Sequence, residues 1–346
     1  MNITNPKDTI LNELRNWMDG KDFLKNLPLV VTGSSGFIGY NLITALSSLG
    51  FYGFALDLEF PHAIQQRLNT NSNFQFLRVN LCDFNQVKGV SEKLPDKFAL
   101  IHLASPNTEH SVSENKSNKR RFLGFSNQID LELNIAKNLT LALCEKAAYI
   151  IYGSSIDIFG SRPRTNGGNT VNEETHPSPD SPYGFGKLLS ENMFREEFST
   201  RDVPLSILRL PQIYGDYEFL FYQRAIPDFL DCLLDNKAIS ITGDIREVRQ
   251  YLHCSDVILA FLKCIYFSYE GTLQLSGEAV SLQRLLATLE KIAGKVIQKN
   301  FLECSNEARD GYKFSSDKAN EKIGFKQTVS LECGLRSALL VARTAR

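Results

Sequence analysis

Short apolar segments alternate with longer amphipathic segments over the first two thirds of the chain. The apolar segments predict buried strands at residues 29–31, 53–56, 74–77, 98–101, 149–151 and 205–208. Between them, segments such as 38–49 and 130–147 repeat apolar residues at the three- and four-residue spacing of helices. This alternation predicts a parallel sheet with helices on both faces, which is a doubly wound α/β fold.

The same pattern divides the chain into three parts. Residues 28–210 hold the alternating segments and predict one large domain. Residues 211–346 are less regular and predict a smaller lobe that closes over the carboxyl edge of the sheet, with some exchange of chain between the two parts. Residues 1–27 predict a helical extension that packs on the body or on a partner subunit, because apolar residues recur there at helical spacing. Those residues are Ile10, Leu11, Leu14 and Trp17.

The first predicted strand leads into the sequence TGSSGFIG, which places Gly33, Gly36 and Gly39 between a strand and a helix. In a dinucleotide-binding turn these glycines permit the tight turn, the approach of a pyrophosphate and the close packing of the helix. Asp57 ends the next strand, where a carboxylate accepts from the adenosine ribose and disfavours a 2′-phosphate. Asp83 follows the third strand and is predicted to hold the adenine amino group. The pattern predicts a Rossmann domain that binds NAD rather than NADP.

A second motif, SPYGFGK, opens a predicted helix and places Tyr183 and Lys187 one turn apart on the same face. Tyrosine is a poor base at neutral pH because its ordinary pKa is about 10. A neighbouring lysine and a nicotinamide cation favour the phenolate, so the tyrosine can exchange a proton during hydride transfer. A serine at the end of the preceding strand would hold the same substrate oxygen. These residues predict hydride transfer, in which a hydroxyl group is oxidised or a ketone is reduced.

Composition limits the partners of such an enzyme. The chain has 346 residues with 38 basic and 39 acidic side chains, so no net charge attracts nucleic acid or an anionic membrane. No stretch of 18 apolar residues predicts a membrane span, and the charged amino terminus does not resemble a secretory signal. The seven cysteines are scattered, and the histidines show no metal-ligand spacing. We therefore expect a cytoplasmic protein with reduced thiols and no metal.

Taken together, these motifs resemble those of the extended short-chain dehydrogenase/reductases, the nucleotide-sugar epimerase/dehydratase family. The resemblance runs from about residue 29 to near residue 340. It is carried by TGSSGFIG, by IHLAS at 101–105, by SSIDIFG at 154–160, by SPYGFGK and by RLPQIYG at 209–215. In the predicted lobe, the stretch GDIREVRQYLHCSD at 243–256 resembles the segment whose arginine contacts the substrate diphosphate. The resemblance implies NAD as the cofactor and a nucleoside-diphosphate sugar as the substrate.

The resemblance also implies roles for individual residues. Ser155, Tyr183 and Lys187 would form the catalytic triad. The cofactor would be bound by Tyr183 and Lys187 and by Gly33, Gly36, Phe37, Ile38, Gly39, Asp57, Asp83, Leu103 and Ala104. The substrate would be bound by Ser105, Ser155, Gln212, Arg249 and Arg309, the last by a loose alignment. Where this chain has Gln212, Ile245 and Gln250, the family usually has Asn, Gly and Asp, respectively. These departures concern the sugar contacts rather than the cofactor.

Asp157 is the residue that bears on the reaction. Period-two alternation along an extended segment puts its side chain on the same side as that of Ser155, where both face the sugar. Oxidation at C4 acidifies the protons on C3 and C5, and a base at this position can remove one. The other readings are that Asp157 binds a loop backbone or a sugar hydroxyl, or contacts neither. Dehydratases of the family usually have Asp where Ile156 stands, which counts against 4,6-dehydration.

We therefore expect transient oxidation of the sugar, at C4, by tightly bound NAD, followed by epimerisation or proton abstraction beside the ketone. A 4-keto reductase, a decarboxylase or dehydratase, and a non-catalytic dinucleotide sensor are the alternatives. A homodimer is also expected, because the predicted helices 124–147 and 182–198 are the pair that this family packs into a four-helix interface. Leu131, Ile135 and Leu139 give the first helix an apolar stripe, which would equally serve to cover the chain's own sheet.

Overall fold

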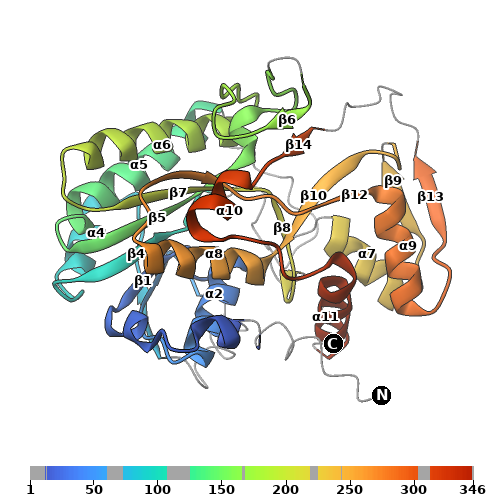
Figure 1. Ribbon diagram of the computed structural model, residues 1–346, viewed down its shortest axis with the longest axis horizontal. Helices are drawn as coiled ribbons and strands as arrows, with labels where there is room; N and C mark the ends of the chain where they lie inside the picture. Colours follow the sequence, from blue (N-terminus) through green and yellow to red (C-terminus); the bar gives the residue numbers. More distant parts are fainter. Residues whose placement is uncertain are drawn as a thin grey trace.

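A seven-stranded, entirely parallel sheet forms the centre of the large domain in the computed structural model (Figure 1). The structure describes residues 12, 14–60, 73–106, 125–165, 168–218, 225–242, 244–302 and 312–344. In spatial order the strands are β3 (Phe74–Arg78), β2 (Gly53–Asp57), β1 (Leu29–Thr32), β4 (Phe98–His102), β5 (Ala147–Ser155), β7 (Leu205–Leu210) and β11 (Gly271–Gln274). The six predicted strands and the doubly wound fold are confirmed.

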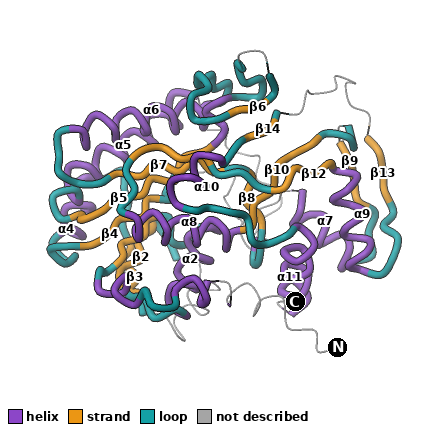
Figure 2. Tube along the Cα trace, viewed as in Figure 1, coloured by secondary structure: helices purple, strands orange, loops and turns teal. Residues whose placement is uncertain are grey.

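Helices cover both faces of this sheet (Figure 2). On one face lie α4 (Phe84–Ser91), α5 (Phe125–Leu143) and α6 (Pro182–Ser199), and on the other lie α2 (Phe37–Ser48) and α8 (Cys254–Phe267). Because both faces are covered, β1 and β4 in the middle of the sheet are buried at every residue, which explains why they are continuous apolar segments instead of alternating ones.

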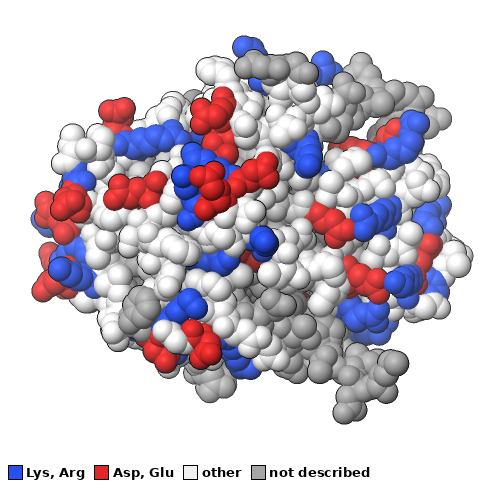
Figure 3. Space-filling model, viewed as in Figure 1, with Lys and Arg blue, Asp and Glu red and all other residues white. Residues whose placement is uncertain are grey.

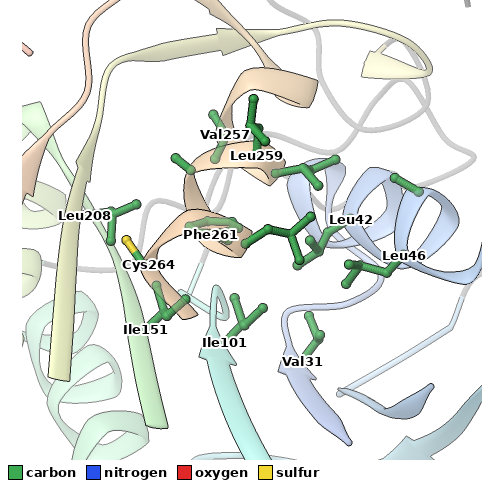
Figure 4. Close-up of a cluster of buried hydrophobic side chains, with 14 of the residues drawn as sticks. Val31, Leu42, Leu46, Ile101, Ile151, Leu208, Val257, Leu259, Phe261 and Cys264 are labelled. Carbon is green, nitrogen blue, oxygen red and sulfur yellow. The ribbon is translucent and has the colours of Figure 1, made fainter. Parts of the chain in front are cut away.

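The register of the sheet sorts these residues into two cores. Val30 pairs with Leu100 and Leu100 with Ile150, and all three pack in the core under α4, α5 and α6. Their neighbours Val31, Ile101 and Ile151 point to the opposite face and meet side chains of α2 and α8 such as Leu42, Leu46 and Phe261 (Figure 4). Each fully buried side chain of this size contributes about 1.5–3 kcal/mol. The carboxyl ends of the strands are thereby held at fixed positions.

The C-terminal part has smaller sheets and its own core. A three-stranded sheet contains β12 (Glu278–Ser281), β10 (Val248–His253) and β8 (Gln212–Tyr214), and β13 (Lys299–Leu302) pairs with β9 (Ile239–Thr242). The helices α7 (Ala225–Leu234), α9 (Leu282–Ala293) and α11 (Leu331–Thr344) pack around them. However, α8 and β11 return to the large sheet, so the two parts exchange chain. The division at residue 210 stays an interpretation.

The N-terminal segment packs on the large domain where it is described. Residues 14–18 are helical, Leu14 is buried, and the Trp17 ring meets the Tyr266 ring of α8 edge to face at 5.7 Å. A 3₁₀ turn, η1 (Asp22–Asn26), then leads to β1. Ile10 and Leu11 lie outside the described residues.

Some local predictions were wrong. The helix expected to reach residue 147 ends at Leu143. A turn follows, in which Lys146 N donates to Leu143 O, and β5 begins directly after it at Ala147. The predicted elements also omit β6 (Thr170–Val171), which pairs with β14 (Lys313–Phe314), and the short helix α10 (Asp317–Ile323) that follows β14.

The surface carries both signs of charge. In Figure 3 acidic and basic side chains lie beside one another over the visible face, and neither sign forms a continuous field. None of the described helices is long and apolar enough to cross a membrane. Within the described ranges there is also no group of three or more His, Cys, Asp or Glu side chains arranged to hold a metal ion.

Candidate active site

The glycine turn after β1 is built for close backbone contacts. Gly33 has a φ of +69°, and a Cβ there would come within 2.6 Å of the Ala104 nitrogen. A Cβ on Gly39 would overlap the Gly33 carbonyl oxygen, so α2 can lie this close to the turn only with glycine at that position. The predicted roles of these two glycines in the turn and in helix packing therefore have a direct steric reason.

The N-terminus of α2 is open toward the turn. Gly36 is the N-cap and supplies no side-chain hydrogen bond, which leaves first-turn N–H groups for another acceptor. The Phe37 side chain is buried and that of Ile38 is partly buried in the core, so these two residues present backbone rather than side chain to a ligand. In the described structure the buried Ser34 hydroxyl also has no hydrogen-bond partner. This cradle fits a pyrophosphate.

Asp57 connects the turn to the second strand. Its carboxylate accepts from the backbone nitrogens of Ser35 at 2.8 Å and Leu58 at 2.7 Å. Burial raises the pKa of this carboxyl above its ordinary value, and hydrogen bonds from Ser35 and Leu58 oppose that change. Asp83 instead caps α4 by accepting from the backbone nitrogens of Asn85 and Gln86. Its predicted adenine contact stays a prediction.

The end of β4 is joined to the same turn. The Thr32 hydroxyl lies 2.7 Å from His102 Nδ1 and accepts from the backbone nitrogens of Leu103 and Ala104 at 3.3 Å. The pKa of His102 is lowered well below its ordinary value by burial and by the nearby charge of Lys187, so the ring is neutral. Leu103 and Ala104, which were predicted to contact the cofactor, are thus held against the glycine turn.

Tyr183 and Lys187 lie at the start of α6, beside the end of β5. Ser181 caps the helix by accepting from the Gly184 nitrogen. Lys187 is buried, and its Nζ donates to the Gly153 carbonyl at 3.2 Å and lies 5.7 Å from the centre of the half-buried Tyr183 ring. Ser155 is the last residue of β5 and is also buried. The strand end and the helix start therefore bring the three predicted catalytic residues to one region.

Sequence reasoning missed a buried acid in this region, Glu132 of α5. Its Oε1 lies 3.0 Å from Lys187 Nζ and accepts from the Tyr152 hydroxyl at 3.2 Å, and its Oε2 accepts from the Ser105 hydroxyl at 2.6 Å. Ser105, predicted to bind substrate, thus donates to a protein carboxylate. The sequence contained an indication of this buried acid, because Glu132 stands three residues before the buried Ile135 and therefore lies on the apolar face of a helix.

A second missed network fixes α6 to the sheet. Glu191 is fully buried and receives two hydrogen bonds from Arg209 of β7, at 3.1 and 2.9 Å. It also receives one from Arg195 at 2.6 Å and one from the Ser154 hydroxyl at 2.5 Å. Because Ser154 precedes Ser155 and Glu191 lies one turn beyond Lys187, this network sets the position of the catalytic helix relative to β5.

The comparisons with known proteins agree with this geometry. A sequence model of the NAD dependent epimerase/dehydratase family matches residues 29–271. The chain belongs to this family. NAD is the family's cofactor, and the described turn and the open N-terminus of α2 fit it. Gly33, Gly36, Gly39 and Asp57 are the residues that would hold its diphosphate and adenosine ribose.

Individual relatives are distant and carry different activities. The chain is 26% identical over 263 residues to a dTDP-D-glucose 4,6-dehydratase of Dictyostelium discoideum, a match that covers 70% of this chain and 56% of that protein. It is 25% identical to a dTDP-4-dehydro-6-deoxyglucose reductase of Escherichia coli, over 89% of this chain and 95% of the relative. A solved UDP-glucuronic acid 4-epimerase of Bacillus cereus, in complex with UDP-glucuronic acid and NAD, superimposes with a TM-score of 0.74 at 24% identity. That likeness covers 92% of this chain and 100% of the other.

Asp157 is not on an extended segment, so the geometric argument made for it was wrong. A 3₁₀ turn, η2 (Ile156–Phe159), begins directly after Ser155, and the Asp157 nitrogen donates to the Ser155 hydroxyl at 3.1 Å. The turn ends the alternation of side chains, so Asp157 does not share a face with Ser155 by strand geometry. Its side chain is exposed, next to the start of α6. Its role as a base stays a prediction.

The predicted substrate residues of the C-terminal part are less well defined. Gln212 is half-buried on β8, and Arg249 is exposed on β10 with its Nε 3.3 Å from Glu247. Gln250, a departure from the family pattern, binds the backbone of Gly277 and Phe314 and therefore holds strands together. Arg309 lies outside the described residues.

A cavity beside α6 and β7 lies apart from the predicted site. None of the predicted catalytic or binding residues lines it. Its lining consists of Glu173, Glu174, His176, Pro177, Leu188, Asn192, Arg195, Arg209, Thr272 and Lys318. Two of these, Arg195 and Arg209, are already paired with Glu191.

Proposed function

We propose that this chain modifies a nucleoside-diphosphate sugar by transient oxidation of a sugar hydroxyl, at C4, with tightly bound NAD, and then returns the hydride. The observation that supports this proposal most strongly is the buried Lys187 ammonium 5.7 Å from the centre of the Tyr183 ring. When bound, NAD supplies the hydride acceptor.

The residues of the chain divide the proton chemistry among them. Tyr183 takes the proton of the reacting hydroxyl, and the positive charge of Lys187 favours the phenolate that does so. The Ser155 hydroxyl, at the end of β5, holds the same substrate oxygen. On the return of the hydride, Tyr183 gives the proton back, so the enzyme ends the cycle unchanged.

Tyr183→Phe tests this assignment. We expect turnover to fall by at least about 100-fold, because general acid–base catalysis contributes roughly that much or more, while NAD affinity changes little. Turnover is measured with a nucleotide sugar that raises the melting temperature of the protein. NAD affinity is measured by titrating the same preparation with NAD. Unchanged turnover would remove Tyr183 from the mechanism.

The proposal for Asp157 is that it removes a proton from C3 or C5 beside the transient ketone. Its place in the turn directly after Ser155, with its backbone carbonyl beside Gly184 of α6, supports this role. Wild-type enzyme working in heavy water should then place deuterium on carbon, and Asp157→Asn should abolish that exchange while hydride transfer at C4 continues. If wild type incorporates no carbon-bound deuterium, the base role is wrong and epimerisation at C4 or reduction remains.

A 4-keto reductase is the second candidate, and one observation favours it. The Escherichia coli reductase matches over 95% of its own length. A reductase would use the same Ser155, Tyr183 and Lys187 but would consume reduced cofactor with each turnover. Steady oxidation of added reduced cofactor with a keto-sugar, and none with ordinary nucleotide sugars, would identify it. Cofactor-neutral turnover of an ordinary nucleotide sugar would exclude it.

Substrate identity would be set by the C-terminal part. We propose that Gln212, Arg249 and Arg309 contact the nucleotide sugar, with the arginines at the diphosphate. A panel of UDP-, dTDP-, GDP- and CDP-sugars, screened by melting temperature, would identify the base and sugar, because a ligand that binds only the native state raises it. Arg249→Ala should reduce the stabilisation by the chosen ligand, and equal stabilisation would remove Arg249 from the site.

We also propose a homodimer, and we place it in the cytoplasm because all six described cysteines are free thiols. The stripe suggested for the interface is not available, since Ile135 and Leu139 are buried against the chain's own sheet. However, Leu141, Phe185 and Leu189 of α5 and α6 are 52%, 36% and 41% exposed. These residues can pair the helices with those of a second copy. A monomer mass in solution at micromolar concentration would refute the dimer.

A further inference from the structure

The ion pair between Glu132 and Lys187 is enclosed by protein. The side chains are 5% and 2% exposed, and Glu132 Oε1 lies 3.0 Å from Lys187 Nζ. Two hydroxyl groups, of Ser105 and Tyr152, also donate to the carboxylate, one to each oxygen. A buried carboxylate with this many donors is held in one place.

The helices are shaped to admit this pair. Gly186 directly precedes Lys187, and a Cβ at that position would come within 3.2 Å of the Glu132 Cβ. A larger residue there would push α5 and α6 apart at the level of the ion pair. Glycine at position 186 therefore lets α5 and α6 pack closely at the level of Lys187.

The other ionisable groups around Lys187 leave Glu132 as its counter-charge. Burial and the charge of Lys187 lower the pKa of His102 well below its ordinary value, and burial, with Glu132, raises that of Tyr152 well above its ordinary value, so both are neutral. Glu191 of α6 is paired with Arg209 and Arg195 at 2.9 and 2.6 Å. Tyr183 itself completes the set, 5.7 Å from Lys187 Nζ to its ring centre.

We propose that Glu132 is a positioning residue that holds Lys187 beside Tyr183 and offsets its charge, and that it thereby sets the pH at which the Tyr183 phenol ionises. The negative carboxylate opposes formation of a second negative charge on the phenol, so it keeps ionisation at higher pH than Lys187 alone would. The proposal rests on the proposed function only in giving Tyr183 the proton-transfer role. The ionisation itself can be measured without substrate.

The effect is large enough to measure. The carboxylate lies 3.0 Å from Lys187 Nζ, which is 5.7 Å from the ring centre, so the carboxylate is within about 9 Å of the ring. At that separation an effective dielectric constant of about 20 corresponds to a shift of about one pH unit. Glu132→Gln is therefore expected to lower the midpoint of Tyr183 ionisation by about one pH unit. Glu132→Asp, which keeps the charge but withdraws it by one methylene, should fall between the two.

The experiment is a titration of phenolate absorbance in the full-length protein. The Tyr183 signal is the difference between each protein and the same protein carrying Tyr183→Phe. Asp130→Asn, which removes an exposed charge from the same helix, serves as the control and should leave the midpoint unchanged. Glu132→Asp also keeps the test available if Glu132→Gln does not fold.

Equal midpoints in wild type, Glu132→Asp and Glu132→Gln would overturn the proposal, as would equal shifts in Glu132→Gln and Asp130→Asn. With a substrate in hand, the acid limb of the kcat/KM profile should move to lower pH by the same amount. If no nucleotide sugar turns over, the proposed function fails while the absorbance titration still decides the role of Glu132.

Discussion

Replacing Glu191 by glutamine tests whether the buried network that holds α6 to the sheet has the importance its geometry implies. Glu191 is fully buried and receives hydrogen bonds from Arg209, Arg195 and Ser154. The side chain of Arg209 is only 5% exposed, so glutamine would leave its guanidinium without a counter-charge inside the protein.

Loss of one partner from a buried ion pair costs about 3–5 kcal/mol, because the remaining charge is neither solvated nor compensated. We expect Glu191→Gln to lower the free energy of unfolding by that amount. This is a large part of the roughly 5–15 kcal/mol that stabilises a typical protein. The loss should be accompanied by reduced activity, since Tyr183 and Lys187 lie on the same helix.

Urea unfolding followed by circular dichroism measures the effect, and Glu197→Gln is the matched control. Glu197 lies on α6 as well, but it is 45% exposed and 3.5 Å from Arg201. Exposed pairs of this kind contribute about 0–1 kcal/mol. The reasoning is refuted if Glu191→Gln loses less than about 1 kcal/mol, or if the two variants lose the same amount.

Three further predictions each concern one residue. Gly39→Ala should weaken NAD binding at least tenfold in a fluorescence titration, because its Cβ would overlap the Gly33 carbonyl and displace α2; unchanged affinity would contradict the steric argument. Asp57→Ala should reduce the ratio of NAD affinity to NADP affinity. A ratio equal to that of the wild type would show that Asp57 does not contact the adenosine ribose. Burial lowers the pKa of His253 to about 3, so the folded state resists its protonation. Stability should fall as pH drops from about 6.5 toward 3, by up to about 1.4 kcal/mol per pH unit from this residue. In melting curves recorded at several pH values, His253→Gln should reduce this dependence of stability on pH. An unaltered dependence would show that His253 is not its cause.

The large sheet could be predicted because its information is local. Each strand is a short apolar segment, and TGSSGFIG carries the steric requirements of the turn within eight residues. The same holds for SPYGFGK, where Tyr183 and Lys187 are one helical turn apart. The strand β11 was missed because Gly271–Gln274 is short and lies among irregular segments, and only its pairing with β7 identifies it.

The buried acids could not be paired from sequence. Glu132 precedes Lys187 by 55 positions, and Glu191 precedes Arg209 by 18, so no spacing rule connects them. Their partners are set by how α5, α6 and β7 pack. The alternation argument for Asp157 failed for a different reason: the strand ends at Ser155, where that hydroxyl caps a 3₁₀ turn, and alternation does not continue past it.

The most direct test of transient oxidation uses a nucleotide sugar that stabilises the protein and carries deuterium at C4. Purified protein with its bound NAD is mixed rapidly with this sugar, and the absorbance of reduced nicotinamide and the label in the product are followed. We predict that reduced nicotinamide forms and disappears within one turnover, and that the deuterium remains in the product without net consumption of cofactor. A turnover without reduced nicotinamide, or a product whose new C–H hydrogen comes from added reduced cofactor, would contradict the proposed function.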